Sequence, residues 1–208
     1  MFSYQRYFPD IEIEPRGKKM EEGQESQDLR LAERLAELRI GQGWSLEQLA
    51  QLTGISRATL SRVERAETSP TASLLGKLSA AYGLTTSRLL MALEDNPPEL
   101  IRRAQQPVWH DRETGFERRS VSAPAPGFRA ELISGLLKSG ATISYDSPPV
   151  DGLEQHIWML EGVLEFTLDG RCYRLEAGDC LRFHLHGTTS FHVPGPQDAR
   201  YAIVISRP

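Results

Sequence analysis

The sequence predicts an α+β protein of two domains, an all-α domain at the N-terminus and an all-β domain at the C-terminus. Apolar residues recur about every 3.6 residues up to Leu93, and after Pro107 they alternate with a period of two. A chain of 208 residues is longer than one small domain and suits two. Pro97 and Pro98 separate the two patterns, so we place an interdomain linker at residues 94–106.

Residues 1–27 precede the first apolar periodicity and are polar, with a run rich in Lys and Glu. This composition predicts a poorly ordered N-terminal arm. An arm that enters the minor groove of DNA is a second interpretation of Arg16, Lys18 and Lys19, although several glutamates follow directly. Met20 is an alternative to Met1 as the start of translation.

Residues 45–64 predict two short helices joined by a tight turn. Ser45 and Gln48 have the spacing of a capping box at the start of the first helix. Gly54 stands where a helix ends in the left-handed conformation, which a residue without Cβ adopts at little cost. Ser56 is in the N-cap position of the second helix. The apolar residues of the pair predict one buried face: Leu46, Leu49, Ile55, Leu60 and Val63.

The other face of the second helix carries short polar and cationic side chains. They are Arg57, Ala58, Thr59, Ser61 and Arg62. A helix-turn-helix unit inserts such a surface into the major groove, where arginine and hydroxyl groups read base edges. We therefore predict sequence-specific binding to double-stranded DNA. A plain αα-hairpin is the alternative, since capped helices around a glycine are common in all-α domains.

From Leu29 to Leu93 the chain resembles the lambda-repressor-like XRE family, whose DNA-binding domains have five helices. The resemblance implies a domain over residues 28–93. Its first helix is expected from about Asp28 to Gln42, its fourth from about Ala72 to Tyr82, and its fifth after Thr85.

The same resemblance implies roles for individual residues. Base contacts are expected from Arg57, Ala58, Ser61 and Arg62, and phosphate contacts near Leu46 and Gln51. Arg39 and Glu64 occupy the positions of an ion pair in phage repressors, so we interpret them as a structural pair. Ala66 departs from the pattern, because many members have Gly after the recognition helix.

The net charge of −4 is divided unequally between the domains. Residues 28–93 hold eight basic and six acidic side chains, and residues 107–208 hold ten basic and thirteen acidic ones. Phosphate contacts from one mildly cationic helical domain give weak affinity. We therefore expect a homodimer that places two helix-turn-helix units on one duplex.

Short runs of alternating or β-rich residues fill residues 107–208, separated by Gly, Pro and Asp. This pattern is typical of an antiparallel sandwich or a small barrel. Asp169 and Gly170 predict a hairpin turn. The predicted runs are residues 115–122, 128–138, 141–146, 156–168, 172–177, 180–185, 189–193 and 200–206.

The segments WMLEGVLEFTLDG and LEAGDCLRF resemble the two motif frameworks of the cupin family. The resemblance implies a cupin, a small double-stranded β-helix barrel, over residues 107–208. An XRE domain followed by a cupin is a familiar architecture of bacterial regulators, so the resemblance implies a transcription regulator.

The ligand positions of metal-binding cupins hold other residues in this chain. Counting from the glycines of the two motifs puts Gln155 at the Glu position and Thr189 at the later His position. Pro149 and Asp151 fall near the His-x-His pair. An amide and a hydroxyl do not replace imidazole and carboxylate as ligands of a divalent ion. We therefore expect no metal and no cofactor.

Four histidines lie near these positions. His156 is one residue out of register, and strand alternation turns it, with His184 and His192, away from the barrel interior. His186 falls in a loop, and a shifted metal site is the alternative interpretation. The same alternation leaves Trp158 on the outer face, which we expect another strand or subunit to cover.

The interior of the barrel is the expected ligand pocket. Alternation predicts that it is lined by Gln155, Ile157, Met159, Thr189 and Phe191. An apolar pocket with a few hydrogen-bonding groups suits a small-molecule effector. We therefore predict a regulator without enzymatic activity that senses a small ligand. A metal-dependent, epoxidase-like cupin enzyme and a cupin that serves only as a dimerisation scaffold are the alternatives.

No stretch of the sequence approaches 18 uncharged apolar residues, so we expect no transmembrane helix. The first 19 residues lack the apolar segment of a secretory signal. Two cysteines, Cys172 and Cys180, are too few for a disulfide framework. These observations predict a cytoplasmic protein.

Overall fold

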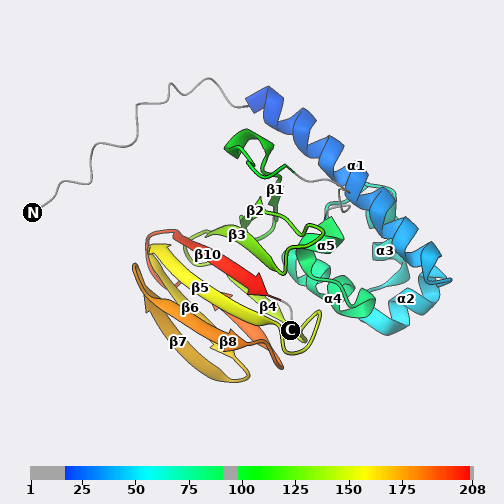
Figure 1. Ribbon diagram of the computed structural model, residues 1–208. Coiled ribbons are helices and arrows are strands. Elements are labelled where there is room, and N and C mark those ends of the chain that lie inside the picture. The colour runs from blue at the N-terminus through cyan, green and yellow to red at the C-terminus, as the bar shows by residue number, and fades with distance from the viewer. Residues whose placement is uncertain (1–16, 91–97, 207–208) are drawn as a thin grey trace, which may run out of the picture.

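The computed structural model describes residues 17–90 and 98–206, which form a helical domain followed by a β-barrel (Figure 1). The predicted order of an all-α and an all-β domain is therefore confirmed. Buried leucines form the core of the helical domain, among them Leu35, Leu49 and Leu75. Its helices are α1 (Gly17–Gly41), α2 (Leu46–Thr53), α3 (Arg57–Glu64), α4 (Ala72–Tyr82) and α5 (Thr86–Leu90).

Local sequence signals fix the ends of α2 and α3. The Ser45 Oγ accepts a hydrogen bond from the Gln48 backbone at 3.1 Å, and the Gln48 side chain accepts one from the Ser45 backbone at 2.8 Å. Gly54 ends α2 at a φ of 68°, and the Ser56 Oγ caps α3 by accepting from the Thr59 backbone. The predicted pair of capped helices is confirmed.

The predicted start of the first helix near Asp28 is wrong, because α1 begins at Gly17. Residues 17–27 are mostly Lys, Glu, Gln and Met, which lose little side-chain freedom in a helix, and no proline interrupts them. The poorly ordered arm predicted from their polarity is therefore wrong for residues 17–27. Residues 1–16 of the predicted arm lie outside the described residues, as do the side chains of Lys18 and Lys19. No helix in the described part of the chain is long and apolar enough to span a bilayer.

Part of the predicted linker, residues 94–97, also lies outside the described residues. The part that follows Pro97 contains one short 3-10 helix, η1 (Arg103–Gln105), and leads directly into the first strand.

Within the described residues, ten strands form two antiparallel sheets, with the orders β1-β2-β3-β10-β5-β8 and β4-β9-β6-β7. All eight predicted runs are strands, and the run 156–168 divides at Gly162 into two of them. The short strand β1 was not predicted. The strands are β1 (Val108–His110), β2 (Glu117–Ser122), β3 (Ala130–Leu137), β4 (Thr142–Tyr145), β5 (Glu154–Glu161), β6 (Val163–Leu168), β7 (Arg171–Glu176), β8 (Cys180–His184), β9 (Thr189–His192) and β10 (Ala199–Ser206).

Aromatic rings fill the space between the two sheets. The ring centroid of Phe166 lies 5.0 Å from that of Phe183 and 4.8 Å from that of Phe191. The Phe191 ring stacks on that of Tyr201, with 5.9 Å between the centroids. Gly135 makes room for this cluster, because a Cβ at that position would overlap the Tyr201 ring. The small barrel that the cupin resemblance implies is therefore a packed body with one sheet on each side.

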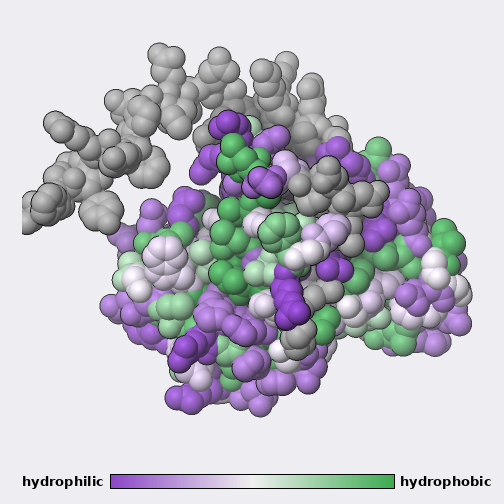
Figure 2. Space-filling view, in the orientation of Figure 1, coloured by the Kyte–Doolittle hydropathy of each residue, from purple (hydrophilic) through white to green (hydrophobic). Residues whose placement is uncertain are grey.

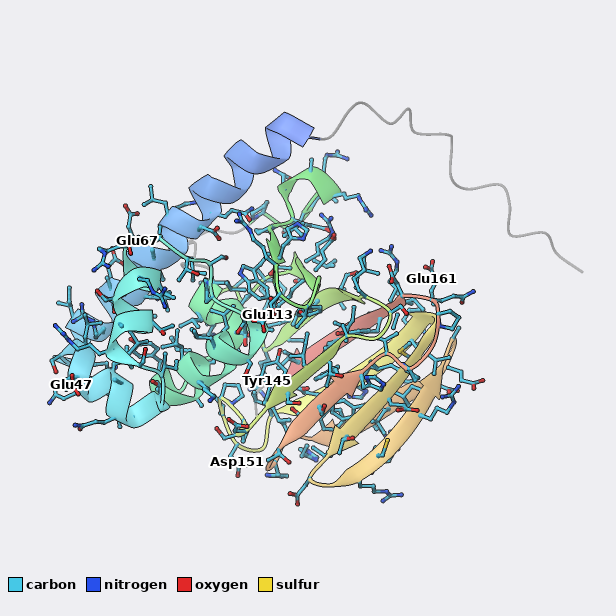
Figure 3. The ribbon with its side chains drawn as sticks, turned by 180° about the vertical axis from the view of Figure 1, so that it is seen from behind. Glu47, Glu67, Glu113, Tyr145, Asp151 and Glu161 are labelled. Carbon is cyan, nitrogen blue, oxygen red and sulfur yellow. The ribbon has the colours of Figure 1, made fainter. Side chains whose placement is uncertain are left out.

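Helix α4 lies against one end of the barrel, so the two domains share a buried junction (Figure 1). The Ala72 backbone N–H, in the first turn of α4, donates to the Asp111 Oδ2 at 2.8 Å. A Cβ at Gly76 would overlap the ring of Tyr145, which packs against this helix. Figure 3 shows Tyr145 between the helices and the strands. The sequence analysis did not predict this junction.

Candidate nucleic-acid interface and barrel cavity

Helix α3 lies on the side of the helical domain that faces away from the barrel (Figure 1). Arg57, Ala58 and Arg62 are exposed, whereas Thr59 and Ser61 are half-buried. Neither the Arg57 nor the Arg62 guanidinium forms a hydrogen bond or ion pair with another described residue. Both guanidinium groups are therefore available to bases or phosphates.

The two hydroxyls of this face already have partners within the helix. The Thr59 Oγ1 lies 2.8 Å from the Ser56 Oγ, and the Ser61 Oγ accepts a hydrogen bond from the Arg65 guanidinium. Arg65 also forms an ion pair with Glu67 at 2.6 Å. Sequence reasoning missed Arg65, although its spacing of four residues from Ser61 places both side chains on one face.

The two predicted phosphate contacts belong to α2. Leu46 is its first residue, where a helix leaves backbone N–H groups without an intrahelical acceptor. Gln51 is exposed further along the same helix. Figure 3 places Glu47, the neighbour of Leu46, at the end of the helical domain that is farthest from the barrel. The start of α2 therefore lies far from the barrel.

Arg39 and Glu64 form a two-pronged ion pair between α1 and α3. The Arg39 Nε and Nη2 donate to the two carboxylate oxygens of Glu64 at 2.7 and 2.8 Å, and its Nη1 donates to the Trp44 carbonyl at 2.9 Å. The hydrogen bond to Glu64 raises the pKa of Arg39 above its usual value. The pair lies among packed side chains, so it positions α3 and offers little to DNA.

A cavity of about 100 Å³ lies where the barrel meets the helical domain. Of the five residues predicted to line it, Gln155, Thr189 and Phe191 do so. Ile157 and Met159 are buried but do not border the cavity. Sequence reasoning missed the wall formed by α4, which consists of Ala72, Leu75 and Gly76.

Arg118 is the cationic group of this cavity. It lies on β2, and its guanidinium donates to the Ser87 Oγ at 2.6 Å and to the Ser120 Oγ at 3.3 Å. Burial lowers the pKa of Arg118, but an arginine remains charged because its usual pKa is so high. Burial also raises the pKa of Tyr145 to about 12 and that of Tyr201 further, so both phenols keep their protons. The alternation of Phe116, Arg118 and Ser120 was the signal that could have placed Arg118 inside.

The histidines do not gather at one point. His156 contacts Glu154 at 2.9 Å, His192 contacts Thr142 at 2.9 Å, and His186 contacts Asp151 at 2.7 Å. His184 is exposed on β8, and Figure 3 shows Asp151 in a loop at the edge of the barrel. Within residues 27–90 and 98–206, no group of three or more His, Cys, Asp or Glu is placed to hold a metal ion. The side chains present do not fit a metal centre.

Comparison with known proteins gives the family. Residues 35–89 match the helix-turn-helix family model HTH_3. The HTH-type transcriptional regulator SutR of Escherichia coli K12 is 30% identical over 178 residues, which cover 86% of this chain and 95% of that protein. This chain belongs to the HTH-type transcriptional regulators. A second such regulator, PuuR of Escherichia coli K12, is 30% identical over 147 residues, 70% of this chain and 77% of that protein.

A solved structure supports the fold of this HTH-type regulator. The crystal structure of an HTH_3 family transcriptional regulator from Vibrio cholerae covers 89% of this chain and 99% of that chain, with a TM-score of 0.71 and 22% identity. The regulator therefore has a helix-turn-helix domain joined to a barrel of two antiparallel sheets.

Proposed function

We propose that this regulator binds its operator as a homodimer and senses a small molecule in the cavity between the barrel and α4. It has no resident metal, catalyses no reaction, and works in the cytoplasm. The observation that carries this proposal is the position of the cavity, because a helix of the DNA-binding domain forms one of its walls. A ligand there contacts both domains at once.

Such a ligand changes DNA binding only if it prefers one arrangement of the two domains. Helix α4 packs on α2, which precedes the recognition helix α3, and Tyr145 of the barrel packs on Gly76 of α4. A ligand that displaces Tyr145 therefore acts on α4 and, through it, on the helix-turn-helix pair.

On the operator, Arg57 and Arg62 read base edges together with the shorter side chains of α3, Ala58, Thr59 and Ser61. The backbone N–H of Leu46 and the side chain of Gln51 hold phosphates and so set the register of α3 in the groove. The exposed guanidinium groups and the outward position of α3 support these roles.

The outer face of the six-stranded sheet is the surface that we assign to the dimer. Trp158 on β5 is 53% exposed and lies beside Ala202 of β10, and half-buried Leu132 and Val204 are paired nearby. Figure 2 shows apolar side chains gathered over β3 and β10 on this face. A second copy that covers this surface would place two recognition helices on one duplex.

Two experiments test the proposal. The DNA that flanks the gene should contain an inverted repeat that the purified protein protects, with half-sites about one helical turn apart. A thermal-shift screen of metabolites should find a ligand that raises the melting temperature and changes operator affinity. A barrel that binds no metabolite would instead be a dimerisation scaffold.

The absence of enzymatic activity has its own test. Purified protein, analysed by inductively coupled plasma mass spectrometry, should contain far less than one equivalent of any transition metal. A chelator should leave its melting temperature and DNA binding unchanged. A stoichiometric metal that is lost in His156→Ala or His186→Ala would favour the metal-dependent enzyme instead.

A further inference from the structure

We propose that the cavity binds a small organic acid whose carboxylate pairs with Arg118. The inference rests on the sensor function proposed above and adds the chemical class of its ligand. Arg118 is 6% exposed and borders the cavity, so a ligand placed there meets a positive charge that is almost completely removed from solvent.

The direct hydrogen-bond partners of Arg118 are neutral, and the carboxylate of Glu131, which acts on its charge, lies beyond ion-pairing distance. The two hydrogen bonds of Arg118 go to the neutral hydroxyls of Ser87 and Ser120. No carboxylate of the described residues lies within ion-pairing distance of its guanidinium. A buried cation is costly unless an anion accompanies it. A ligand carboxylate would supply that anion and two oxygens for the planar guanidinium.

Two further donors border the same cavity. Tyr145 and Tyr201 both line it, and neither hydroxyl forms a hydrogen bond with another described residue. Burial raises the pKa of each phenol, so at neutral pH both remain O–H donors. A ligand carboxylate accepts about four hydrogen bonds, and one guanidinium and two phenols can donate that many. A ligand ammonium accepts none and a ligand amide accepts fewer, so a carboxylate fits these donors best.

The rest of the wall sets the size and character of the ligand. A volume of about 100 Å³ holds on the order of eight water-sized atoms. Aromatic and aliphatic side chains surround it, including Phe166, Phe191 and Ile143. The cavity therefore suits a monocarboxylate with a short apolar body, of which benzoate and hexanoate are convenient probes.

Glu131 on β3 is the acidic group whose charge acts on Arg118, but its side chain is not part of the cavity wall. Its Oε1 accepts from the Thr85 hydroxyl at 3.0 Å, its Oε2 has no partner among the described residues, and it does not border the cavity. An ammonium group in the cavity would meet Arg118 rather than Glu131, and like charges repel.

The test measures binding of these probes to the full-length protein by isothermal titration calorimetry and thermal shift. Benzoate and hexanoate should raise the melting temperature and bind at least tenfold more tightly than benzamide or benzylamine. Arg118→Met should weaken benzoate binding about tenfold to a hundredfold. Arg119→Met is the matched control, because Arg119 lies on the other face of β2, paired with Glu117 at 3.2 Å, and should leave binding unchanged.

If Arg118→Met does not fold, Tyr201→Phe and Tyr145→Phe test the same inference, because each removes one phenol donor. Each should weaken benzoate binding about threefold to tenfold. Equal affinity for benzoate and benzylamine, or no binding by any carboxylate from acetate to benzoate, would overturn the inference. A different class of compound that changes operator affinity would leave the sensor function intact and refute only the organic acid. Benzoate that binds through Arg118 without any effect on operator affinity would refute the sensor function alone.

Discussion

Arg57 and Arg62 are the two residues of α3 whose guanidinium groups have no partner in the described structure. Replacing either by Ala should cost about 1–3 kcal/mol of operator binding, because a base contact is lost. Binding to random DNA should fall much less. Both affinities can be measured by fluorescence anisotropy at one fixed salt concentration.

The Lys variants at these two positions are the control. Arg57→Lys and Arg62→Lys keep the charge but lose the planar fork that bonds a guanine edge at two points. They should bind random DNA like the parent protein and the operator more weakly. If Ala and Lys variants weaken both DNAs equally, the assigned recognition face is wrong.

Ala66 carries backbone strain just after the recognition helix. Its φ is 56°, in the left-handed region that L-residues adopt at a cost, and the Glu67 N–H closes the end of α3 onto the Arg62 carbonyl at 2.9 Å. Ala66→Gly should therefore raise the free energy of unfolding by about 1 kcal/mol, measured by urea denaturation.

Ala36 provides the matched control inside helix α1. Ala36→Gly should lower the free energy of unfolding by about 0.5–1 kcal/mol, because glycine loses more backbone freedom in a helix. The two substitutions are chemically identical, so changes of the same sign would show that backbone conformation does not decide the effect.

Among the structural elements, those with local signals were predictable and those that depend on distant partners were not. Ser45, Gly54 and Gly83 cap helices, and a cap contacts only residues close to it in the sequence. The structure places each of the three at a helix end. No local signal explains Gly76, because the Tyr145 ring that requires a glycine there belongs to the other domain. For Arg118, the alternation along β2 was a local signal for burial, but its hydroxyl partner Ser87 on α5 could not be predicted from that strand alone.

The contact between α4 and β4 gives a prediction for these two elements. Gly76→Ala adds a Cβ that overlaps the Tyr145 ring, so it should lower the free energy of unfolding by about 1–3 kcal/mol. With the ring removed in Tyr145→Ala, the same substitution should instead stabilise by up to about 1 kcal/mol, because alanine favours a helix. A double-mutant cycle by urea denaturation measures this reversal.

Ser73→Ala is the control on the exposed side of α4. It should change the free energy of unfolding by less than about 0.5 kcal/mol in both backgrounds. A Gly76→Ala effect that is the same with and without the Tyr145 ring would mean that α4 does not rest on the barrel.

At the scale of the whole molecule, the proposed dimer depends on the outer face of the six-stranded sheet. Trp158→Asp puts a charge on that face and should convert the dimer to a monomer, measured by light scattering. Operator affinity should fall with it, while binding to a single half-site stays the same. Leu100→Asp, at an exposed apolar residue outside the sheets, should leave the dimer intact. A parent protein that is already monomeric would contradict this arrangement.

The order of domains followed from the sequence because apolar periodicity is a property of each segment alone. The way the domains meet did not, because it is decided by side chains that are neighbours only after folding. Glu131 and Thr85 illustrate this, being 46 residues apart and joined by one hydrogen bond.

The hydrogen bond from the Ala72 backbone to Asp111 limits which helical domains can be joined to this barrel. Asp111 of the barrel accepts the hydrogen bond from a backbone N–H in the first turn of α4. The Tyr145 ring of the barrel also lies so close to α4 that only a glycine fits at position 76. In a chimaera that joins this barrel to the helices of a relative, the two domains would therefore pack poorly against each other. Good packing requires that the junction residues of both domains are exchanged together.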